Sequence, residues 1–236
     1  MLLCMLVALL FFYVYFEQVQ RAVLSVCYPS ANQYVHSRRT IREMTLAHLA
    51  LTLAATAGSS IVGVLLGILI TRESGKEFLT PVLRLQAFIQ TFPPSAVIIL
   101  AFPVLGFGWK PALLALFLYS LFPVLGNTVV GLQSVDRAVV DAAKGMGMTG
   151  WQRLWLAEFP QALSMIITGI RHSYILNLGT AAIASVIGGD GLGTIIISGL
   201  TLQNSALVLS GTIVISLLAL IGEQITRLVR QEAHEA

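Results

Sequence analysis

Residues 131–160 read GLQSVDRAVVDAAKGMGMTGWQRLWLAEFP and join two strongly apolar runs of the chain. The stretch from Ser134 to Met146 has the pattern of a helix, and Gly147 is expected to stop it because glycine readily adopts the left-handed backbone conformation. Residues 149–152 (TGWQ) have the spacing of a capping box that opens another helix. We therefore predict two short helices, separated by a tight turn, that protrude from the body of the protein.

The composition of the rest of the chain is that of a membrane protein. Of 236 residues, 56% are hydrophobic and 11% are charged, and the mean hydropathy is +0.84. An average soluble domain has roughly 45–50% apolar and about 25% charged residues. A bilayer core needs roughly 20 mostly apolar residues per helix, and such runs recur along almost the whole length. We expect helices near 1–16, 45–70, 82–104, 111–130, 161–187 and 206–222.

These helices predict an all-α integral membrane protein with about six transmembrane spans. The predicted parts are a first transmembrane helix with an external loop (1–44), a core transmembrane domain (45–222) and a cytoplasmic tail (223–236). Of the 14 Lys and Arg residues, nine fall in segments that are cytoplasmic if both termini are inside, and five fall on the opposite side. This bias places loop 131–160 in the cytoplasm, although Arg38, Arg39 and Arg42 crowd ahead of the second helix on the external side.

Charge and cysteine usage exclude several other classes of protein. The formal net charge is +3, and the basic residues are scattered between apolar runs without a dense block, which argues against nucleic acid as a partner. Cys4 lies in the first apolar run and Cys27 in the loop after it, so no disulfide framework is predicted. The run from Met1 to Phe16 lacks the basic start and the cleavage site of a secretory signal, and we interpret it as a short helix. No metal site is predicted.

Two features of the apolar runs predict how the helices pack. Ser59, Gly63 and Gly67 recur every four residues and form a stripe of small residues that lets a neighbouring helix approach closely. The neighbour is either within this chain or in a second subunit. Residues 90–94 (QTFPP) contain two prolines, which kink or break a membrane helix, and broken backbone at that depth faces protein or a water-filled cavity. A structural kink and a break that lines a pathway both remain open.

The spacing within loop 131–160 resembles that of a known family. Asp141-Ala142-Ala143, followed by Gly147 and then Pro160, is similar to the Glu-Ala-Ala cytoplasmic loop of binding-protein-dependent ABC importer permeases. Asp141, Ala157 and Phe159 stand where that family usually has Glu, Ile and Leu, which keeps the charge or the apolar character. The resemblance implies the type I ABC importer permease fold with a cytoplasmic coupling helix that seats in a groove of an ATPase subunit. By resemblance, the coupling residues are Asp141, Ala142, Ala143, Lys144, Gly145, Gly147 and Pro160.

Further stretches narrow the resemblance to permeases of osmoprotectant importers. They are QTFP at 90–93, KPALLALFLYS at 110–120, AAKGMGMT at 142–149, and GIR at 169–171 with GTA at 179–181. The resemblance implies import of a quaternary amine, of the glycine betaine, choline or carnitine type, by alternating access in a bacterial cytoplasmic (inner) membrane. It also implies three partners: ABC ATPase subunits that bind ATP and Mg²⁺, a second permease that is identical or paralogous, and a periplasmic or lipid-anchored substrate-binding protein. A permease for another small polar solute, such as an amino acid, is the alternative.

The chain itself is predicted to be a transporter subunit, without a cofactor and without enzymatic activity. No Gly-x-x-x-x-Gly-Lys-Ser/Thr phosphate loop occurs in it, so ATP hydrolysis belongs to a partner. The remaining alternatives are an interfacial hairpin without a partner, a passive channel or assembly factor that uses the loop only as a docking site, and an intramembrane hydrolase. A hydrolase would use His48 or His172 with Ser59 or Ser60, but no carboxylate or nucleophile-elbow motif accompanies them.

Polar residues and glycines in the predicted spans are candidates for the transport path. Buried polar groups in lipid face the protein interior, although they also serve as hydrogen bonds between helices. A glycine-rich run at 188–193 allows tight backbone geometry for an external gate or a re-entrant turn, and a plain loop is the alternative. The path candidates are Gln90, Thr91, Pro93, Asn177 and Thr180, and the gate candidates are Gly188, Gly191 and Gly193.

Overall fold

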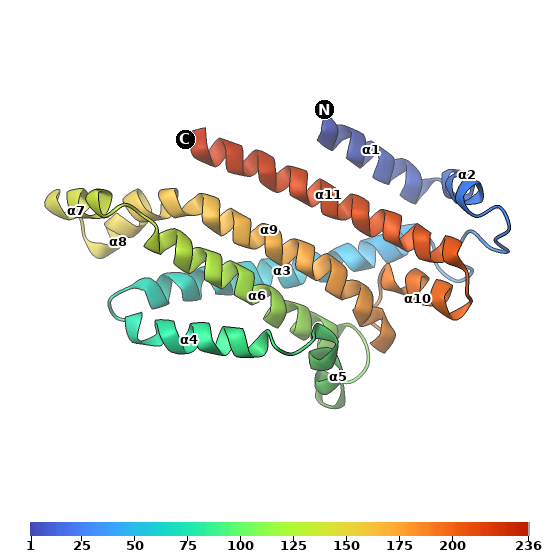
Figure 1. The fold of residues 1–236 in the computed structure, drawn as a ribbon, viewed down its shortest axis with the longest axis horizontal. Coiled ribbons are helices and arrows are strands. Elements are labelled where there is room, and N and C mark those ends of the chain that lie inside the picture. The colour runs from blue at the N-terminus through green and yellow to red at the C-terminus, as the bar shows by residue number, and fades with distance from the viewer. Residues whose placement is uncertain (236) are drawn as a thin grey trace.

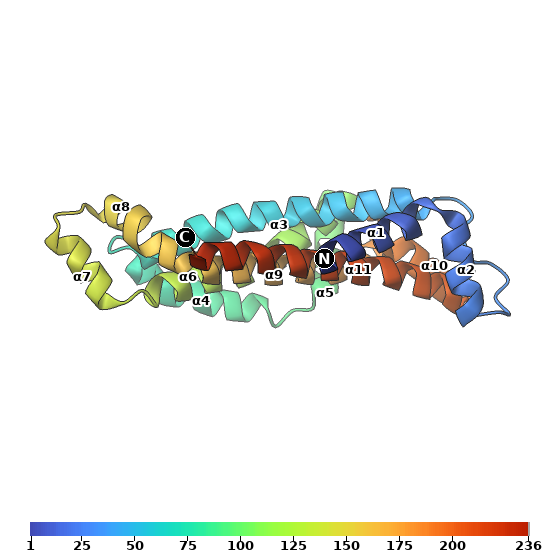
Figure 2. The ribbon, with the colours of Figure 1, turned by 90° about the horizontal axis from the view of Figure 1, so that it is seen from above.

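Long apolar segments of the chain form helices that run along one common axis (Figures 1 and 2). The structure is a computed structural model that describes residues 1–235, and no strand occurs within that range. Its elements are α1 (Leu2–Tyr15), α2 (Glu17–Cys27), α3 (Ile41–Thr71), α4 (Lys76–Ile89), α5 (Pro94–Leu105), α6 (Trp109–Gln133), α7 (Arg137–Gly145), α8 (Gly150–Arg153), a π-helical turn η1 (Leu154–Glu158), α9 (Phe159–Ala184), a 3₁₀ turn η2 (Ser185–Ile187), α10 (Gly193–Thr201) and α11 (Ser205–Glu235).

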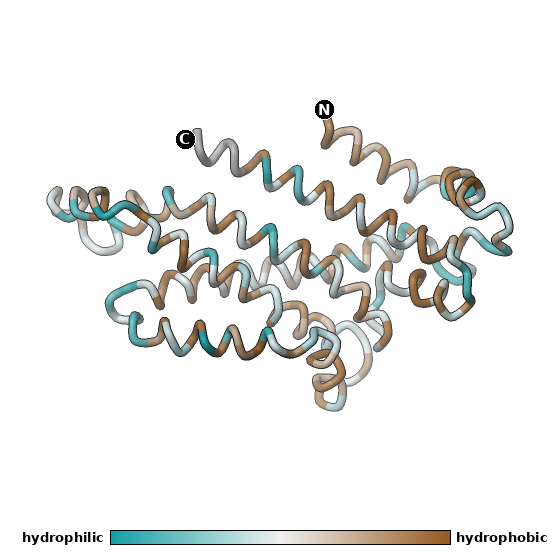
Figure 3. The backbone as a smooth tube through the Cα atoms, viewed as in Figure 1, coloured by the Kyte–Doolittle hydropathy of each residue, from teal (hydrophilic) through white to brown (hydrophobic). Residues whose placement is uncertain are grey.

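The predicted all-α membrane architecture is confirmed, although fewer helices qualify as spans than the six predicted. By length and composition, α3, α6 and residues 205–229 of α11 can each cross a membrane, and the described residues give up to five spans if each bent pair of helices counts as one. The helix expected at 161–187 is present as α9. Helix α9 is less apolar than the three candidate spans, because Arg171, His172 and Asn177 lower its mean hydropathy. Figure 3 shows hydrophobic residues along the long helices and hydrophilic residues gathered toward the two ends of the bundle.

Glycines bring α3 and α6 into close contact at the centre of the bundle. A Cβ added to Gly63 would lie 2.9 Å from Val124 Cβ, and one added to Gly67 would lie 2.7 Å from Thr128 Cγ2. The stripe of small residues on α3 therefore packs within this chain, which was one of the two predicted possibilities. Gly169 brings α9 equally close to α6, since a Cβ added to Gly169 would lie 2.8 Å from the carbonyl oxygen of Pro123 on α6. Helices α3, α6 and α9 thus form one tightly packed core.

The predicted span at 82–104 is wrong as a single helix. It is divided into α4 and α5, whose axes meet at 92°. Pro93 is the extended N-cap of α5 and Pro94 occupies its first turn, where a proline ring is compatible with a helix start but not with continuation of α4. The two prolines therefore make a corner, which is a sharper break than a kink.

Both ends of the chain contain more helix than predicted. The external loop proposed within 1–44 contains α2, which bends by 96° from α1, and Cys27 is the last residue of α2. The charges of this segment suggested a loop, yet α2 is amphipathic and buries Leu24 completely. The proposed tail at 223–236 continues α11 as far as Glu235, and Ala236 lies outside the described residues. The short helix α10, which folds back beside α11 (Figure 1), was not predicted.

Candidate functional site

Helices α7 and α8 form a hairpin that protrudes at one end of the bundle (Figures 1 and 2), and we call residues 134–158 the coupling hairpin. Helix α7 begins at Arg137, later than the predicted Ser134, because Asp136 is its N-cap and accepts a hydrogen bond of 2.9 Å from the backbone nitrogen of Ala138. Ser134 instead ends α6, where its hydroxyl donates to the carbonyl of Gly131. Residues 134–136, the first of the hairpin, are therefore a short non-helical link between α6 and α7.

The turn between α7 and α8 has the local structure that the sequence predicts. Gly147 has φ of 77° and donates a backbone hydrogen bond of 2.9 Å to the carbonyl of Lys144, which is a helix stop in the left-handed region. Both hydrogen bonds of the capping box are present, from Gln152 N to Thr149 Oγ1 at 3.3 Å and from Thr149 N to Gln152 Oε1 at 2.9 Å. The predicted stop and capping box are confirmed.

The predicted coupling residues lie mostly on the surface of the hairpin. Ala143 is the exception, because it is 2% exposed and packs inside the hairpin. Asp141 and Lys144 form an exposed ion pair of 3.1 Å one turn apart, and Pro160 is exposed in the first turn of α9. The exposed members are Asp141, Ala142, Lys144, Gly145, Gly147 and Pro160.

A buried ion pair at the base of the hairpin was missed by the sequence analysis. Glu158 is 5% exposed and contacts Arg72, the C-cap of α3, and Arg153 at the end of α8. The neighbouring turn 72–75 lies beside the hairpin, since Arg72 contacts Glu158. The pKa of Glu73 on that turn is lowered, chiefly by its hydrogen bond to Lys76 and further by the charges of Lys76, Arg153 and Lys144. A single glutamate in a short polar and apolar segment gives no signal in the sequence that it is buried, and so nothing pointed to this contact.

The candidate path residues do not come together in this chain. Gln90, Thr91 and Pro93 are exposed at the corner between α4 and α5, whereas Asn177 and Thr180 are buried on α9. Asn177 Nδ2 donates to Thr56 Oγ1 at 3.0 Å. That contact is a hydrogen bond between helices, which was the stated alternative for these residues.

Asn177 belongs to a line of polar contacts between α3 and α9, which we call the polar seam. Its three rungs join His48 Nε2 to the carbonyl oxygen of Leu178 at 3.1 Å, Thr56 to Asn177, and Ser59 Oγ to Ser173 Oγ at 3.1 Å. His48, Ser59 and Ser173 are fully buried. The polar seam therefore pairs one polar atom of each of these side chains, which would be costly to leave unpaired away from water, while His48 Nδ1 and Asn177 Oδ1 have no hydrogen-bond partner within the described residues.

The glycine-rich run at 188–193 lies over one end of the polar seam. Gly188 has φ of 81°, and an added Cβ there would lie 1.9 Å from the ring of Phe107, while one at Gly191 would lie 3.0 Å from His48 Nδ1. Gly193 begins α10, and an added Cβ would lie 1.9 Å from the carbonyl oxygen of Ala182. This segment is thus a packed turn in which glycine is required, and it leads directly into α10.

The residues proposed for a hydrolase are not arranged for catalysis. Ser59 is bound to Ser173, and His48 is bound to the backbone of Leu178. His48 and Ser59 are separated by about 16 Å along α3, at 1.5 Å per residue, and His172 is exposed on α9. Within the described part of the chain, no group of three or more His, Cys, Asp or Glu side chains is placed to hold a metal ion.

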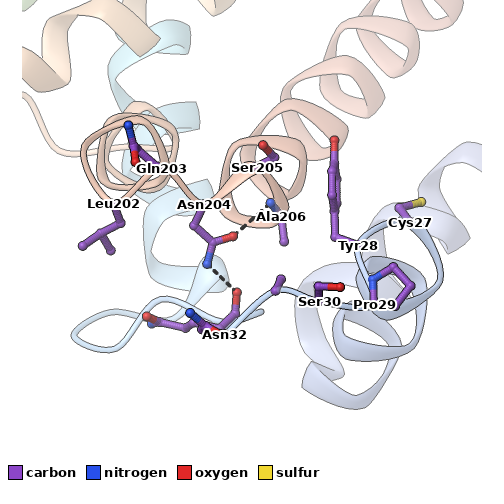
Figure 4. Close-up of a pocket in the computed structure, with 12 residues that line it drawn as sticks. Cys27, Tyr28, Pro29, Ser30, Asn32, Leu202, Gln203, Asn204, Ser205 and Ala206 are labelled. Carbon is purple, nitrogen blue, oxygen red and sulfur yellow. Dashed lines mark hydrogen bonds between the residues drawn. The ribbon is translucent and has the colours of Figure 1, made fainter.

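A pocket of about 510 Å³ (Figure 4) is lined by residues beside α2 and the turn before α11, at the end of the bundle opposite the coupling hairpin (Figure 1). Asn204 joins its two walls, because its Nδ2 donates to the carbonyl oxygen of Gln33 at 2.8 Å and its Oδ1 accepts from the backbone nitrogen of Ala206 at 3.0 Å. The pocket lies between residues 27–33, at the end of α2, and the turn between α10 and α11. It is separate from the candidate path residues.

Comparison of the sequence with known proteins agrees with this arrangement. Residues 63–234 match the family described as the binding-protein-dependent transport system inner membrane component. The chain is 39% identical over 179 residues to the carnitine transport permease protein OpuCB of Listeria monocytogenes. The aligned residues cover 76% of this chain and 81% of the relative. It is 40% identical over 174 residues to the glycine betaine/carnitine/choline transport system permease protein OpuCB of Bacillus subtilis, which covers 74% and 79%. The osmoprotectant import permease protein OsmW of Salmonella typhimurium is 39% identical over 186 residues, with coverage of 77% and 86%.

Solved structures share the fold. The inward-facing MetNI methionine ABC transporter matches with a TM-score of 0.73 at 16% identity, covering 82% of this chain and 95% of that chain. An amino acid ABC transporter with histidines matches with a TM-score of 0.69 at 18% identity, covering 92% and 98%. The predicted type I importer permease fold is confirmed. The chain belongs to the binding-protein-dependent transport system inner membrane component family and is the transmembrane permease subunit of an ABC importer.

Proposed function

We propose that this permease moves a small quaternary amine osmoprotectant, such as glycine betaine, carnitine or choline, into the cytoplasm. The observation that carries the proposal is the identity of 39–40% over about three-quarters of the chain to permeases named for these solutes. The amino acid transporters share the fold at only 16–18% identity. Likeness at that level supports a common fold and gives no support to a common substrate.

The residues of the core suggest that a separate binding protein selects the solute. Quaternary ammonium groups are usually held against aromatic faces, but the polar seam consists of His, Thr, Ser and Asn side chains. The aromatic pairs of the described residues lie outside the polar seam. Phe88 and Phe92 form one edge-to-face pair at the α4–α5 corner, with ring centroids 5.3 Å apart, and a single pair of this kind is not an aromatic cage. Ligand choice then belongs to the binding protein, while this chain supplies the path.

The proposed path lies between this chain and a second permease, identical or paralogous. Gln90, Thr91 and Pro93 are exposed at the α4–α5 corner, and polar groups exposed at membrane depth need a protein or water-filled surface beside them. The proposed energy source is an ABC ATPase, which binds ATP and Mg²⁺ and seats the exposed face of α7. Alternating access follows when that ATPase closes and opens.

Substrate choice is tested by competition in proteoliposomes that contain the permease with its ATPase and binding protein. Uptake of labelled glycine betaine should require ATP, and an excess of choline or carnitine should reduce it by about tenfold, since competing ligands share one site. Methionine and histidine are the matched controls and should have no effect. Competition by the amino acids alone would favour the amino acid alternative, and uptake without ATP would favour a passive channel.

The proposed orientation places both termini and the coupling hairpin in the cytoplasm and the end of α2 outside. Cys27 is exposed at that end, while Cys4 is exposed on the apolar helix α1. A membrane-impermeant maleimide should therefore label Cys27 in right-side-out vesicles and leave Cys4 unlabelled in lipid. Cys27→Ser should abolish the labelling. Labelling that appears only in inside-out vesicles would reverse the topology.

A further inference from the structure

One buried carboxylate joins the coupling hairpin to the end of a core helix. Glu158 Oε2 lies 2.6 Å from Arg72 Nη1, and Glu158 Oε1 lies 2.8 Å from Arg153 Nε, so each oxygen has its own guanidinium partner. Arg72 caps α3, and Arg153 ends α8. A buried charge is tolerated only with well-placed partners, and here those partners come from two elements that are 81 residues apart in the sequence. We call these three residues the Glu158 clamp.

The Glu158 clamp is fixed to the core by an apolar cluster on the same turn. Glu158 ends the π-helical turn η1, whose first residue, Leu154, is 1% exposed. Leu154 packs with Ile68 of α3 and with apolar residues of the other two core helices, Leu132, Ala162 and Ile166. Single π-helical turns occur often at functional sites. The turn therefore has an apolar attachment and an ionic attachment to the same end of α3.

The turn after α3 leaves Arg72 little freedom. Gly75 donates a backbone hydrogen bond of 2.9 Å to the carbonyl of Arg72, and an added Cβ at Gly75 would lie 2.1 Å from the carbonyl oxygen of Leu69. A displacement of η1 therefore pulls on the end of α3 and is not absorbed by a loose loop. The exposed ion pair between Glu73 and Lys76 joins residues three positions apart on the same turn, and Glu73 forms no ion pair with the hairpin within the described residues.

We propose that Glu158 is a positioning residue that transmits movement of the coupling hairpin to α3, so that ATP hydrolysis by the partner opens and closes the path. This role rests on the proposed function, in which the ATPase seats α7, and it adds the route from the hairpin into the membrane. Because Glu158 is buried, the proposal requires no contact between its side chain and the ATPase or the solute. Its effect passes through Arg72.

The experiment compares transport with ATP hydrolysis in the complete importer reconstituted in proteoliposomes. Glu158→Gln keeps the shape of the side chain and removes its charge. Uptake per ATP hydrolysed should fall by about tenfold, because the coupling between two sites in a protein typically changes an equilibrium by about 5- to 150-fold. The rate of ATP hydrolysis itself should change by less than about twofold. Glu158→Asp keeps the charge and should give an uptake per ATP hydrolysed between those of Glu158→Gln and the wild type. Glu73→Gln, on the neighbouring exposed pair, is the matched control and should leave the ratio unchanged.

Variants of Arg72 distinguish a transmitting role from a purely structural one. Arg72→Gln should lower the ratio as Glu158→Gln does, and the double variant should be no worse than either single variant, because they break the same contact. A wild-type ratio in Glu158→Gln, or an equal loss of uptake and hydrolysis in every variant, would overturn the proposal. If Glu158→Gln does not assemble with its partners, uptake per ATP hydrolysed is measured for Arg72→Lys instead. A lowered ratio would support the proposal, and an unchanged ratio would overturn it. A wild-type permease that fails to co-purify with an ATPase would instead contradict the proposed function.

Discussion

Gly147→Asp should lower ATP-driven uptake by at least about tenfold while the membrane helices stay folded. Gly147 lies at the tip of the coupling hairpin with φ of 77°, and an added Cβ would meet nothing within 4 Å. The substitution therefore creates no clash inside the chain. Its effects are strain in the left-handed region, about 1–2 kcal/mol, and a new charge on the face proposed to seat the ATPase, where mismatched charges are costly.

Gly147→Asn supplies a matched control for this prediction. Asparagine has nearly the shape of aspartate and tolerates the same left-handed backbone with φ of 77°, but it carries no charge. Gly147→Asn should therefore retain uptake. The measurement is uptake of labelled solute together with co-purification of the ATPase. Equal losses in the two variants would show that strain alone, and not docking, explains the effect.

Gly67→Ala should lower the thermal unfolding midpoint of the permease by about 5 °C, because overpacking costs about 1–3 kcal/mol. The added methyl group would lie 2.7 Å from Thr128 Cγ2 and 2.8 Å from Thr128 Cβ. Thr128 has little room to move, because it is fully buried and its hydroxyl is bound to the carbonyl of Val124 at 2.8 Å. Helices α3 and α6 must therefore separate.

Gly58→Ala on the same helix is the control for this second prediction. Its added Cβ would lie 3.4 Å from the ring of Phe117, which is an ordinary contact. The midpoint of that variant should stay close to wild type or rise, since alanine favours helix formation. The measurement is thermal unfolding of the detergent-solubilised permease followed by size-exclusion chromatography. A midpoint for Gly67→Ala as high as that for Gly58→Ala would contradict the close approach of α3 and α6.

Local features of this fold were accessible from the sequence because neighbouring residues determine them. The stop at Gly147 and the capping box of Thr149 with Gln152 need only a few consecutive residues, and both are present. The stripe ending at Gly67 was also visible, although its partner was not, because spacing on one helix does not name the facing helix. The coupling and path roles of the individual residues stay predictions.

Features that depend on contacts between distant segments could not be predicted. Helix α2 appeared to be a loop because it is rich in charged and polar residues, and its burial of Leu24 becomes visible only once the helices pack. The right angle at Pro93 depends on the packing of α5 across the bundle. The contact of Glu158 with Arg72 joins segments whose proximity no local pattern reveals.

The close packing of α3, α6 and α9 has a mechanical consequence. Helix α3 contains 31 residues, which makes it a rod about 46 Å long at 1.5 Å per residue. Glycine-lined contacts leave little space for such a rod to bend or slide within the core. We therefore expect the three core helices to tilt as one body, and a tilt of about 5° would displace the far end of α3 by about 4 Å over that length. A small angular movement at the hairpin end would thus shift the opposite surface of the protein by more than the width of a water molecule.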